Sequence, residues 1–326
     1  MRKITYKAST DIALIKYWGK KDEQLRIPEN DSFSIVIDGI YTITTVEFKT
    51  DLDRDEVTID GEQQLKEVNR VSKYLDRFRE LANIKTFAKV VSESNFPRST
   101  GLSSTGSAFA ALTYAATAAL ELDLDQKELS ILARQASGTA CRCVCGGFVQ
   151  WHGGKSSSDS YSETIFPADH WDLRDIVVVV DDKAKQISST AGHKTAQTSP
   201  FYLTRQKNLP SKMKLLQEYV ENRDFTQLGE LIEAEALEFH SILLTSQPPL
   251  LMWQPGTVEV MKTVQALRQS GVEAYFSLNT GFNLHVLTLP EHEEVVAAEL
   301  SKLKLVKNTI KSKIGQKPTE ISQHLF

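Results

Sequence analysis

The chain contains 326 residues, of which 41% are hydrophobic, and its 38 basic and 42 acidic residues give a formal net charge of −4. This length is enough to bury one large core or two modest ones. The slightly negative charge disfavours a nucleic-acid partner held through a broad basic face. A small anionic ligand remains compatible with it, because such a ligand needs only a local cluster of cations.

No segment approaches the roughly 18 consecutive apolar residues of a membrane span. The opening stretch MRKITYKAS has no apolar signal region. We therefore expect a soluble, cytoplasmic protein without a membrane partner.

The first hundred residues read as strands around one helix. Alternating apolar and polar residues on both sides of Asp38-Gly39 predict a hairpin at that pair. A second Asp-Gly at 60–61 predicts another turn in the same sheet. Apolar residues at helical spacing predict an amphipathic helix over 66–81, and the run FAKVVSES predicts a strand over 87–94.

Helices dominate the remainder of the chain. They are predicted over 107–122, 126–135, 211–222, 225–243 and 256–269. The continuous apolar run RDIVVVVDD predicts a buried strand, and AYFSLNTGFNLHVLTL predicts two apolar strands around a Gly turn. A boundary near residue 185 divides a strand-rich half, 1–184, from a helix-rich half, 185–326.

The three cysteines lie together in CRCVCGG, at 141, 143 and 145. A zinc site normally has four ligands at CxxC-like or Cys/His spacing, and no histidine lies close in the sequence. We expect three reduced, buried thiols.

A loop rich in small residues and hydroxyls precedes the predicted helix at 107, in the stretch PRSTGLSSTGSAFAAL. Such a loop exposes backbone N–H groups and the positive end of the helix dipole, and both favour a phosphate. Its hydroxyls can add hydrogen-bond donors or a magnesium ligand. An ordinary capped helix is the alternative, although one cap accounts for only one hydroxyl. The Gly-x-x-x-x-Gly-Lys-Ser/Thr and Gly-x-Gly-x-x-Gly patterns of other nucleotide sites are absent.

The loop resembles the ATP-phosphate loop of the GHMP kinases. The residues that carry this resemblance are Pro97, Gly101, Leu102, Ser103, Ser104, Thr105, Gly106 and Ser107. Four further segments resemble motifs of the diphosphomevalonate decarboxylases within that superfamily. They are DIALIKYWGKKDEQLRIPENDSFSIVID at 11–38, ASGTACRCVCGGFVQW at 136–151, ISSTAGHKTAQTSPFY at 187–202 and YFSLNTGFN at 275–283.

The resemblance implies an α/β (α+β) GHMP-kinase fold. Its N-terminal half would be like domain 2 of ribosomal protein S5 and its C-terminal half ferredoxin-like, with a deep cleft between them. The implied activity is ATP-dependent decarboxylation of 5-diphosphomevalonate to isopentenyl diphosphate, through phosphorylation of the 3-hydroxyl. ATP and Mg²⁺ are the implied cofactors, with Ser104 as a candidate metal ligand, and a homodimer is the implied assembly.

The resemblance also implies roles for particular residues. Arg142 would bind the substrate carboxylate, for which a planar guanidinium is well suited. Lys16 would lie beside the catalytic carboxylate. The diphosphate and the rest of the substrate would be held by Tyr17, Lys20, Ser137, Thr139 and Ser189.

One diphosphate contact is left open by the sequence. Some bacterial relatives have an arginine where Thr190 stands, whereas eukaryotic relatives carry Ser-Thr there. Arg70 and Lys73 on the amphipathic helix could compensate, although a solvated helix face is the alternative for both.

The chain departs from the family pattern at its catalytic aspartate. The first position of the family's Asp-Ala-Gly-Pro-Asn is Asn279 here, and Phe282 replaces the proline. The family's Asn before Ile-Ala is Asp11. We hypothesise that the carboxylate has moved to Asp11, which would hold Lys16 or act as the base. Alternatively, Asn279 marks a lost or altered activity: a 5-phosphomevalonate decarboxylase, a mevalonate 3-kinase or a non-catalytic ligand-binding relative.

Overall fold

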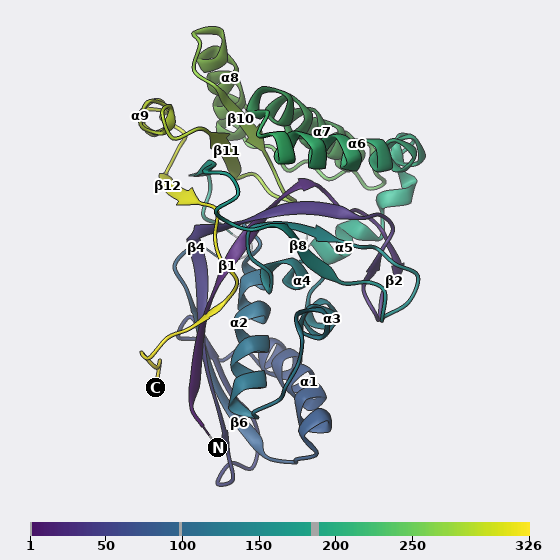
Figure 1. The fold of residues 1–326 in the computed structure, drawn as a ribbon, viewed down its shortest axis with the longest axis vertical. Helices are drawn as coiled ribbons and strands as arrows, with labels where there is room; N and C mark the ends of the chain where they lie inside the picture. The colour runs from purple at the N-terminus through teal and green to yellow at the C-terminus, as the bar shows by residue number, and fades with distance from the viewer. Residues whose placement is uncertain (1, 98–99, 184–188) are drawn as a thin grey trace.

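A computed structural model describes residues 2–97, 100–183 and 189–326. The architecture mixes two main sheets with helices, as predicted (Figure 1). The larger sheet has the strand order β13-β1-β4-β6-β5, and β4 also pairs with β7, which pairs with β8. Its strands are β1 Ile4–Ile15, β4 Ser32–Lys49, β5 Glu56–Ile59, β6 Phe87–Ser94, β7 Phe148–Trp151, β8 Ser162–Phe166 and β13 Thr319–Glu320.

The second sheet has the order β10-β11-β9-β12, all antiparallel. Its strands are β9 Arg174–Val179, β10 Ala274–Ser277, β11 Leu284–Thr288 and β12 Asn308–Lys313. A small third sheet pairs β2 Lys20–Asp22 with β3 Ile27–Pro28. The division near residue 185 stays a prediction; β9, which precedes it, pairs with β11 and β12, which follow it.

The helices cover the two sheets at opposite ends of the molecule (Figure 1). On the larger sheet lie α1 Leu65–Ala82, α2 Ser104–Ala119, α3 Gln126–Ala136 and the short α4 Ala140–Cys143. The second half contributes α5 Ser189–His193, the 3₁₀ turn Ala196–Thr198, α6 Tyr202–Asn222, α7 Phe225–Thr245, α8 Pro255–Gln269 and α9 Glu293–Ser301.

Apolar packing joins the two halves. One core lies between α1, α2 and the larger sheet and contains Phe78 and Phe109. A second core joins Ile35 of β4 to Val177 of β9 and Leu228 of α7. Because side chains from both sheets share this second core, the surfaces that enclose a cavity between them are held by buried packing.

The hairpin prediction at Asp38-Gly39 is wrong. β4 continues through this pair as one long strand, and its register with β1 shifts between Ser9 and Thr10. Gly39 instead contacts β12. Its N–H donates to Ser312 Oγ at 2.8 Å, and a Cβ on Gly39 would lie 2.6 Å from the Lys311 carbonyl oxygen. Glycine is needed there for close approach of a neighbouring strand, not for a turn.

Most other elements match their predictions, and the turn at Asp60-Gly61 follows β5 as expected. Two helices differ at their ends. α2 spans Ser104–Ala119, three residues earlier at both ends than predicted, and so begins inside the hydroxyl-rich loop. α6 begins at Tyr202 although Pro210 lies inside it. The buried side chains of Tyr202 and Arg205 anchor this first part of α6, so tertiary contacts outweigh the missing N–H of the proline.

Candidate active site

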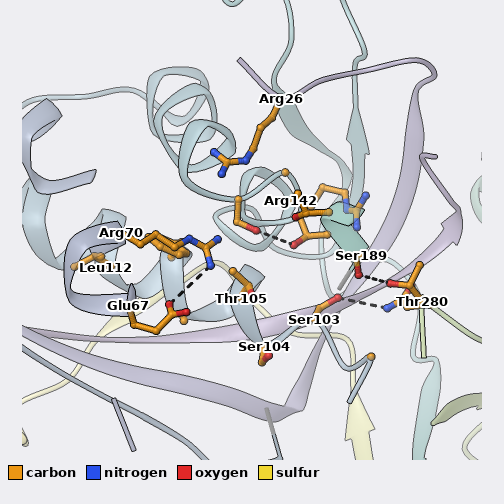
Figure 2. Close-up of a pocket in the computed structure, with 18 of the residues that line it drawn as sticks. Arg26, Glu67, Arg70, Ser103, Ser104, Thr105, Leu112, Arg142, Ser189 and Thr280 are labelled. Atoms are coloured by element: carbon orange, nitrogen blue, oxygen red, sulfur yellow. Dashed lines mark hydrogen bonds and ion pairs between the residues drawn. The ribbon is translucent and has the colours of Figure 1, made fainter. Parts of the chain in front are cut away.

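A cavity of about 970 Å³ opens between the larger sheet, its helices and the turn that joins β10 to β11. Figure 2 shows Ser103, Ser104 and Thr105 of the loop facing this space, with Ser189 and Thr280 beside them. The cavity brings together most of the predicted site residues: Lys16, Tyr17, Lys20, Gly101, Ser103, Ser104, Thr105, Ser137, Thr139, Arg142, Ser189, Thr190 and Asn279.

Four predicted loop residues and Asp11 are not among the residues that line the cavity. Leu102, Gly106 and Ser107 are buried, and the Ser107 hydroxyl lies 2.8 Å from the Thr42 hydroxyl. Pro97 is half-buried, and its carbonyl accepts from Thr100 Oγ1. These four residues belong to the loop but do not line the cavity, and their contact with ATP stays a prediction.

Two residues of the loop, Gly101 and Ser103, have a positive φ angle. Gly101 has φ +95° and Ser103, directly before α2, has φ +55°. The side-chain amide of Asn279 donates to Ser103 Oγ at 3.4 Å, and the hydroxyls of Ser189 and Thr280 lie 2.6 Å apart (Figure 2). The start of α2, α5 and the β10–β11 turn therefore meet at one end of the cavity.

Arg142 is a buried cation that lines the cavity. Its Nε donates to Asp11 Oδ2 at 2.6 Å and its Nη1 to Ser32 Oγ at 3.0 Å, and both charged side chains are almost fully buried. Burial acts to lower the pKa of Arg142, but the adjacent Asp11 carboxylate, together with Cys141 and Tyr17, raises it overall. Arg142 also lines the cavity, so a guanidinium held in place by Asp11 faces the ligand space.

The hypothesis that Asp11 holds Lys16 is wrong. The Asp11 carboxylate is fully buried against Arg142 and lies 3.5 Å from Cys143 Sγ. Lys16 Nζ donates instead to the Ala13 carbonyl at 2.7 Å and to Ser277 Oγ at 2.5 Å. Asp11 acts on Arg142, and Lys16 is positioned by the ends of β1 and β10.

Lys16 has the most perturbed ammonium of the described cavity. Its side chain is buried, and desolvation lowers its pKa to about 7. Glu235 opposes this shift, while Arg205 and Arg142 add to it. A lysine with this pKa exchanges its proton near neutral pH.

Tyr17 and His193 line the cavity as a stacked aromatic pair. The ring of Tyr17 stacks on His193 at 4.6 Å between centroids and meets Trp151 edge to face. Burial raises the pKa of Tyr17 to about 12, so it is a neutral hydroxyl donor. Lys20 Nζ lies 2.9 Å from Glu23 Oε2. His193, missed in the sequence, accepts from the Gly19 N–H at 3.1 Å, and its place in the segment at 187–202 was the available signal.

The far end of the cavity is apolar. Its walls are Val57, Ile59, Val71, Val90, Phe109 and Leu112, with the hydroxyls of Thr44, Ser92 and Ser94. The Arg70 guanidinium carbon lies 4.6 Å from the centroid of the Phe109 ring, and Arg70 Nη2 donates to the Ala136 carbonyl at 3.1 Å. Lys73 is exposed and does not line the cavity. This end combines apolar walls with hydroxyl groups, which suits a nucleobase.

Three further observations concern features outside the cavity. All three cysteines are free and buried, and burial raises the pKa of each, as expected for inert thiols. Over residues 2–97, 100–183 and 189–326, no group of three or more His, Cys, Asp or Glu side chains could hold a metal ion. Within the same ranges no helix is long and apolar enough to cross a membrane.

Family models match both halves of the chain. The diphosphomevalonate decarboxylase-like N-terminal domain matches residues 8–162, and the mevalonate 5-diphosphate decarboxylase C-terminal domain matches residues 175–324. Diphosphomevalonate decarboxylase of Candida albicans is 33% identical over 85% of this chain and 81% of its own length. Phosphomevalonate decarboxylase of Haloferax volcanii is also 33% identical, over 90% of this chain and 92% of its own.

Solved structures agree in fold along the whole chain. Mevalonate diphosphate decarboxylase from Staphylococcus aureus has a TM-score of 0.92 at 34% identity, covering 98% of each chain. The related MDDEF in complex with MVAPP, AMPPCP and magnesium has a TM-score of 0.89 at 36% identity, covering 98% of this chain and 99% of its own. The expected GHMP-kinase fold is confirmed, and the chain belongs to the diphosphomevalonate decarboxylase family.

Proposed function

We propose that this protein is an ATP-dependent decarboxylase of 5-diphosphomevalonate in isoprenoid biosynthesis. The γ-phosphoryl group of ATP is transferred to the 3-hydroxyl of the substrate. Loss of that phosphate together with carbon dioxide then gives isopentenyl diphosphate, with ADP as the other product. One observation carries the proposal: the hydroxyl-rich start of α2 and the buried Arg142 face a single cavity.

The residues of the cavity divide between the two ligands. The apolar end suits adenine, and the loop at the start of α2 offers N–H groups and hydroxyls to the phosphates. Arg142 suits the substrate carboxylate, and Tyr17, Lys20, Ser137, Thr139, Ser189 and Thr190 suit its phosphate end. Arg26 also lines the cavity and adds a cation that the sequence did not single out.

Magnesium fits this arrangement as an ion carried by ATP. Mg²⁺ prefers oxygen ligands and is usually bound by substrate phosphates and only one or two protein groups. The hydroxyl of Ser104, the first residue of α2, lines the cavity and is the oxygen that the protein supplies. When bound, the ion neutralises charge on the phosphates during transfer.

A second candidate is favoured by one residue. Asn279 places an amide in the β10–β11 turn, where the family pattern has its catalytic aspartate. A relative named phosphomevalonate decarboxylase is also as similar to this chain as a relative named diphosphomevalonate decarboxylase. Decarboxylation of 5-phosphomevalonate is therefore the alternative. A 3-kinase without decarboxylation and a binding protein are weaker ones.

Assaying ADP and carbon dioxide separately tests these functions. The protein is incubated with ATP, Mg²⁺ and, in turn, mevalonate, 5-phosphomevalonate or 5-diphosphomevalonate. We expect both products with the diphosphate. Both products with the monophosphate alone would establish the alternative, ADP alone a kinase, and neither product a binding protein.

Assembly and location are also proposals. The family resemblance supports a homodimer in the cytoplasm. Light scattering coupled to gel filtration tests the first, and a mass of one chain of 36.5 kDa would exclude it.

A further inference from the structure

No carboxylate among the described residues lines the cavity at the start of α2, where the 3-hydroxyl would lose its proton. Among the described residues that line it, Glu67 is the only carboxylate. Glu67 lies on α1, where its Oε2 is 3.9 Å from Arg70 Nη1, at the apolar end of the cavity (Figure 2). Asn279, at the end that holds the start of α2, carries an amide, which cannot accept the proton of the 3-hydroxyl.

We propose that the Nζ of Lys16 is the general base that removes the proton from the 3-hydroxyl. This inference rests on the proposed function and deepens it. Lys16 lines the cavity at the end of β1, and Ser277, its hydrogen-bond partner, lies two residues before Asn279. Lys16 is thus placed beside the turn that meets the start of α2.

The hydrogen bonds of Lys16 match a neutral amine. Its two acceptors are the Ala13 carbonyl and Ser277 Oγ, at 2.7 and 2.5 Å. A neutral amine has two N–H bonds and one lone pair, so two acceptors use both N–H bonds. The lone pair is then left for a proton from the ligand.

The surroundings keep Lys16 near its midpoint of titration. Burial lowers its pKa to about 7, Glu235 raises it, and Arg205 and Arg142 lower it further. Of the other nearby groups, Asp11 is paired with Arg142, and burial lowers the pKa of His240 to about 3, which leaves that imidazole neutral. A pKa lowered to about 7 lies in the range in which a general base is most effective.

The transfer step balances with this assignment. The 3-oxygen forms a bond to the γ-phosphorus, and the bond from that phosphorus to the bridging oxygen breaks, which releases ADP. The hydroxyl proton passes to Lys16 Nζ, which becomes an ammonium. After the phosphate, carbon dioxide and product have left, the ammonium gives its proton to water.

The pH dependence of single-turnover ADP formation tests the proposal, because it isolates the transfer step. We expect the rate to rise between pH 6 and 8 as Lys16 loses its proton. Lys16→Arg keeps the positive charge but removes the base, so its rate should fall by roughly a hundred- to ten-thousandfold. Lys207→Met, an exposed lysine on α6, is the matched control and should keep both rate and profile.

A purely electrostatic role for the Lys16 ammonium predicts the opposite result. The rate would then fall as the pH rises through 7, and Lys16→Arg would retain most of the activity. Either observation overturns the proposal.

Lysine NMR tests the same assignment without turnover. In the full chain labelled with ¹³C at lysine Cε, one resonance should titrate near pH 7 and be missing from Lys16→Met. A Lys16 resonance that stays charged up to pH 9 overturns the base assignment whatever the substrate is. Absence of ADP with all three mevalonate derivatives would instead overturn the proposed function.

Discussion

Gly101 and Gly281 pack backbone to backbone. A Cβ on Gly101 would lie 2.7 Å from the Gly281 Cα, and a Cβ on Gly281 would lie 2.7 Å from the Gly101 Cα and from the Thr100 carbonyl oxygen. Cβ atoms do not approach backbone this closely, so either side chain would force the two segments apart. This contact holds the hydroxyl-rich loop at 97–107 against the β10–β11 turn, which carries Asn279.

We therefore expect Gly281→Ala to impair catalysis more than stability. Moving the turn by a few tenths of an ångström changes the alignment of Asn279 and the start of α2, and misplaced reacting groups can cost roughly a hundredfold in rate. Steady-state kcat and KM, with the melting temperature, measure both effects. Gly271→Ala is the control, because Gly271 has φ +88° but nothing within 4 Å of its Cβ position. It should lose about 1 kcal/mol of stability and keep its kcat.

Asp11→Asn should destabilise the fold. It leaves the buried guanidinium of Arg142 without a counter-charge, and breaking a buried pair this way costs about 3–5 kcal/mol. Urea unfolding measures the loss. Asp172→Asn is the control. Asp172 pairs with Arg174 but is exposed, so loss of this ion pair should cost about 0–1 kcal/mol. An Asp11→Asn variant of normal stability that no longer forms ADP would point back to Asp11 as the base.

Ser104→Ala should slow ADP formation by roughly a hundredfold, because it removes a preorganised contact to charge that shifts during transfer. The dependence of rate on Mg²⁺ concentration should also move to higher concentration if the hydroxyl binds the ion. Ser301→Ala, on the exposed end of α9, is the control and should match the wild type. Unchanged turnover and magnesium dependence in Ser104→Ala would remove this hydroxyl from the site.

Asn279→Asp should move the rising limb of the pH–rate profile to higher pH. A carboxylate in this turn adds negative charge on the side of Ser277, which favours the charged form of Lys16 and raises its pKa. At pH 7 fewer Lys16 side chains are then neutral. A strong gain of activity at pH 7 would instead mean that Asn279 is the loss of a catalytic group.

The parts of the site that the sequence predicted are those that local segments carry. The glycines and hydroxyls of the loop at 97–107 predict the start of a helix, and α2 begins there at Ser104. Residues brought in by distant segments left no such signal. The Lys16 backbone N–H donates a hydrogen bond to Glu235, 219 residues away. Its Nζ donates to Ser277, 261 residues away. The sequence alone therefore paired it with the wrong carboxylate.

The wrong fold predictions have the same origin. Asp38-Gly39 has the composition of a turn, but Ser312 and Lys311 from the far end of the chain fix its role. Pro210 reads as a helix start, but Arg205 before it is buried and donates to the Lys16 carbonyl at 2.9 Å. In both places a long-range contact overrides a sound local signal.

The pairing of β13 with β1 has a consequence for synthesis on the ribosome. Tyr6 and Lys7 pair with Glu320 and Thr319, and the Thr5 hydroxyl lies 2.7 Å from His324 Nδ1, which is 319 residues away in sequence. The outer edge of β1 thus emerges first and gains its partner last. Until then it exposes unpaired N–H and C=O groups, which can template pairing with another nascent chain. Late closure of so long a loop therefore leaves this edge open to such pairing during translation.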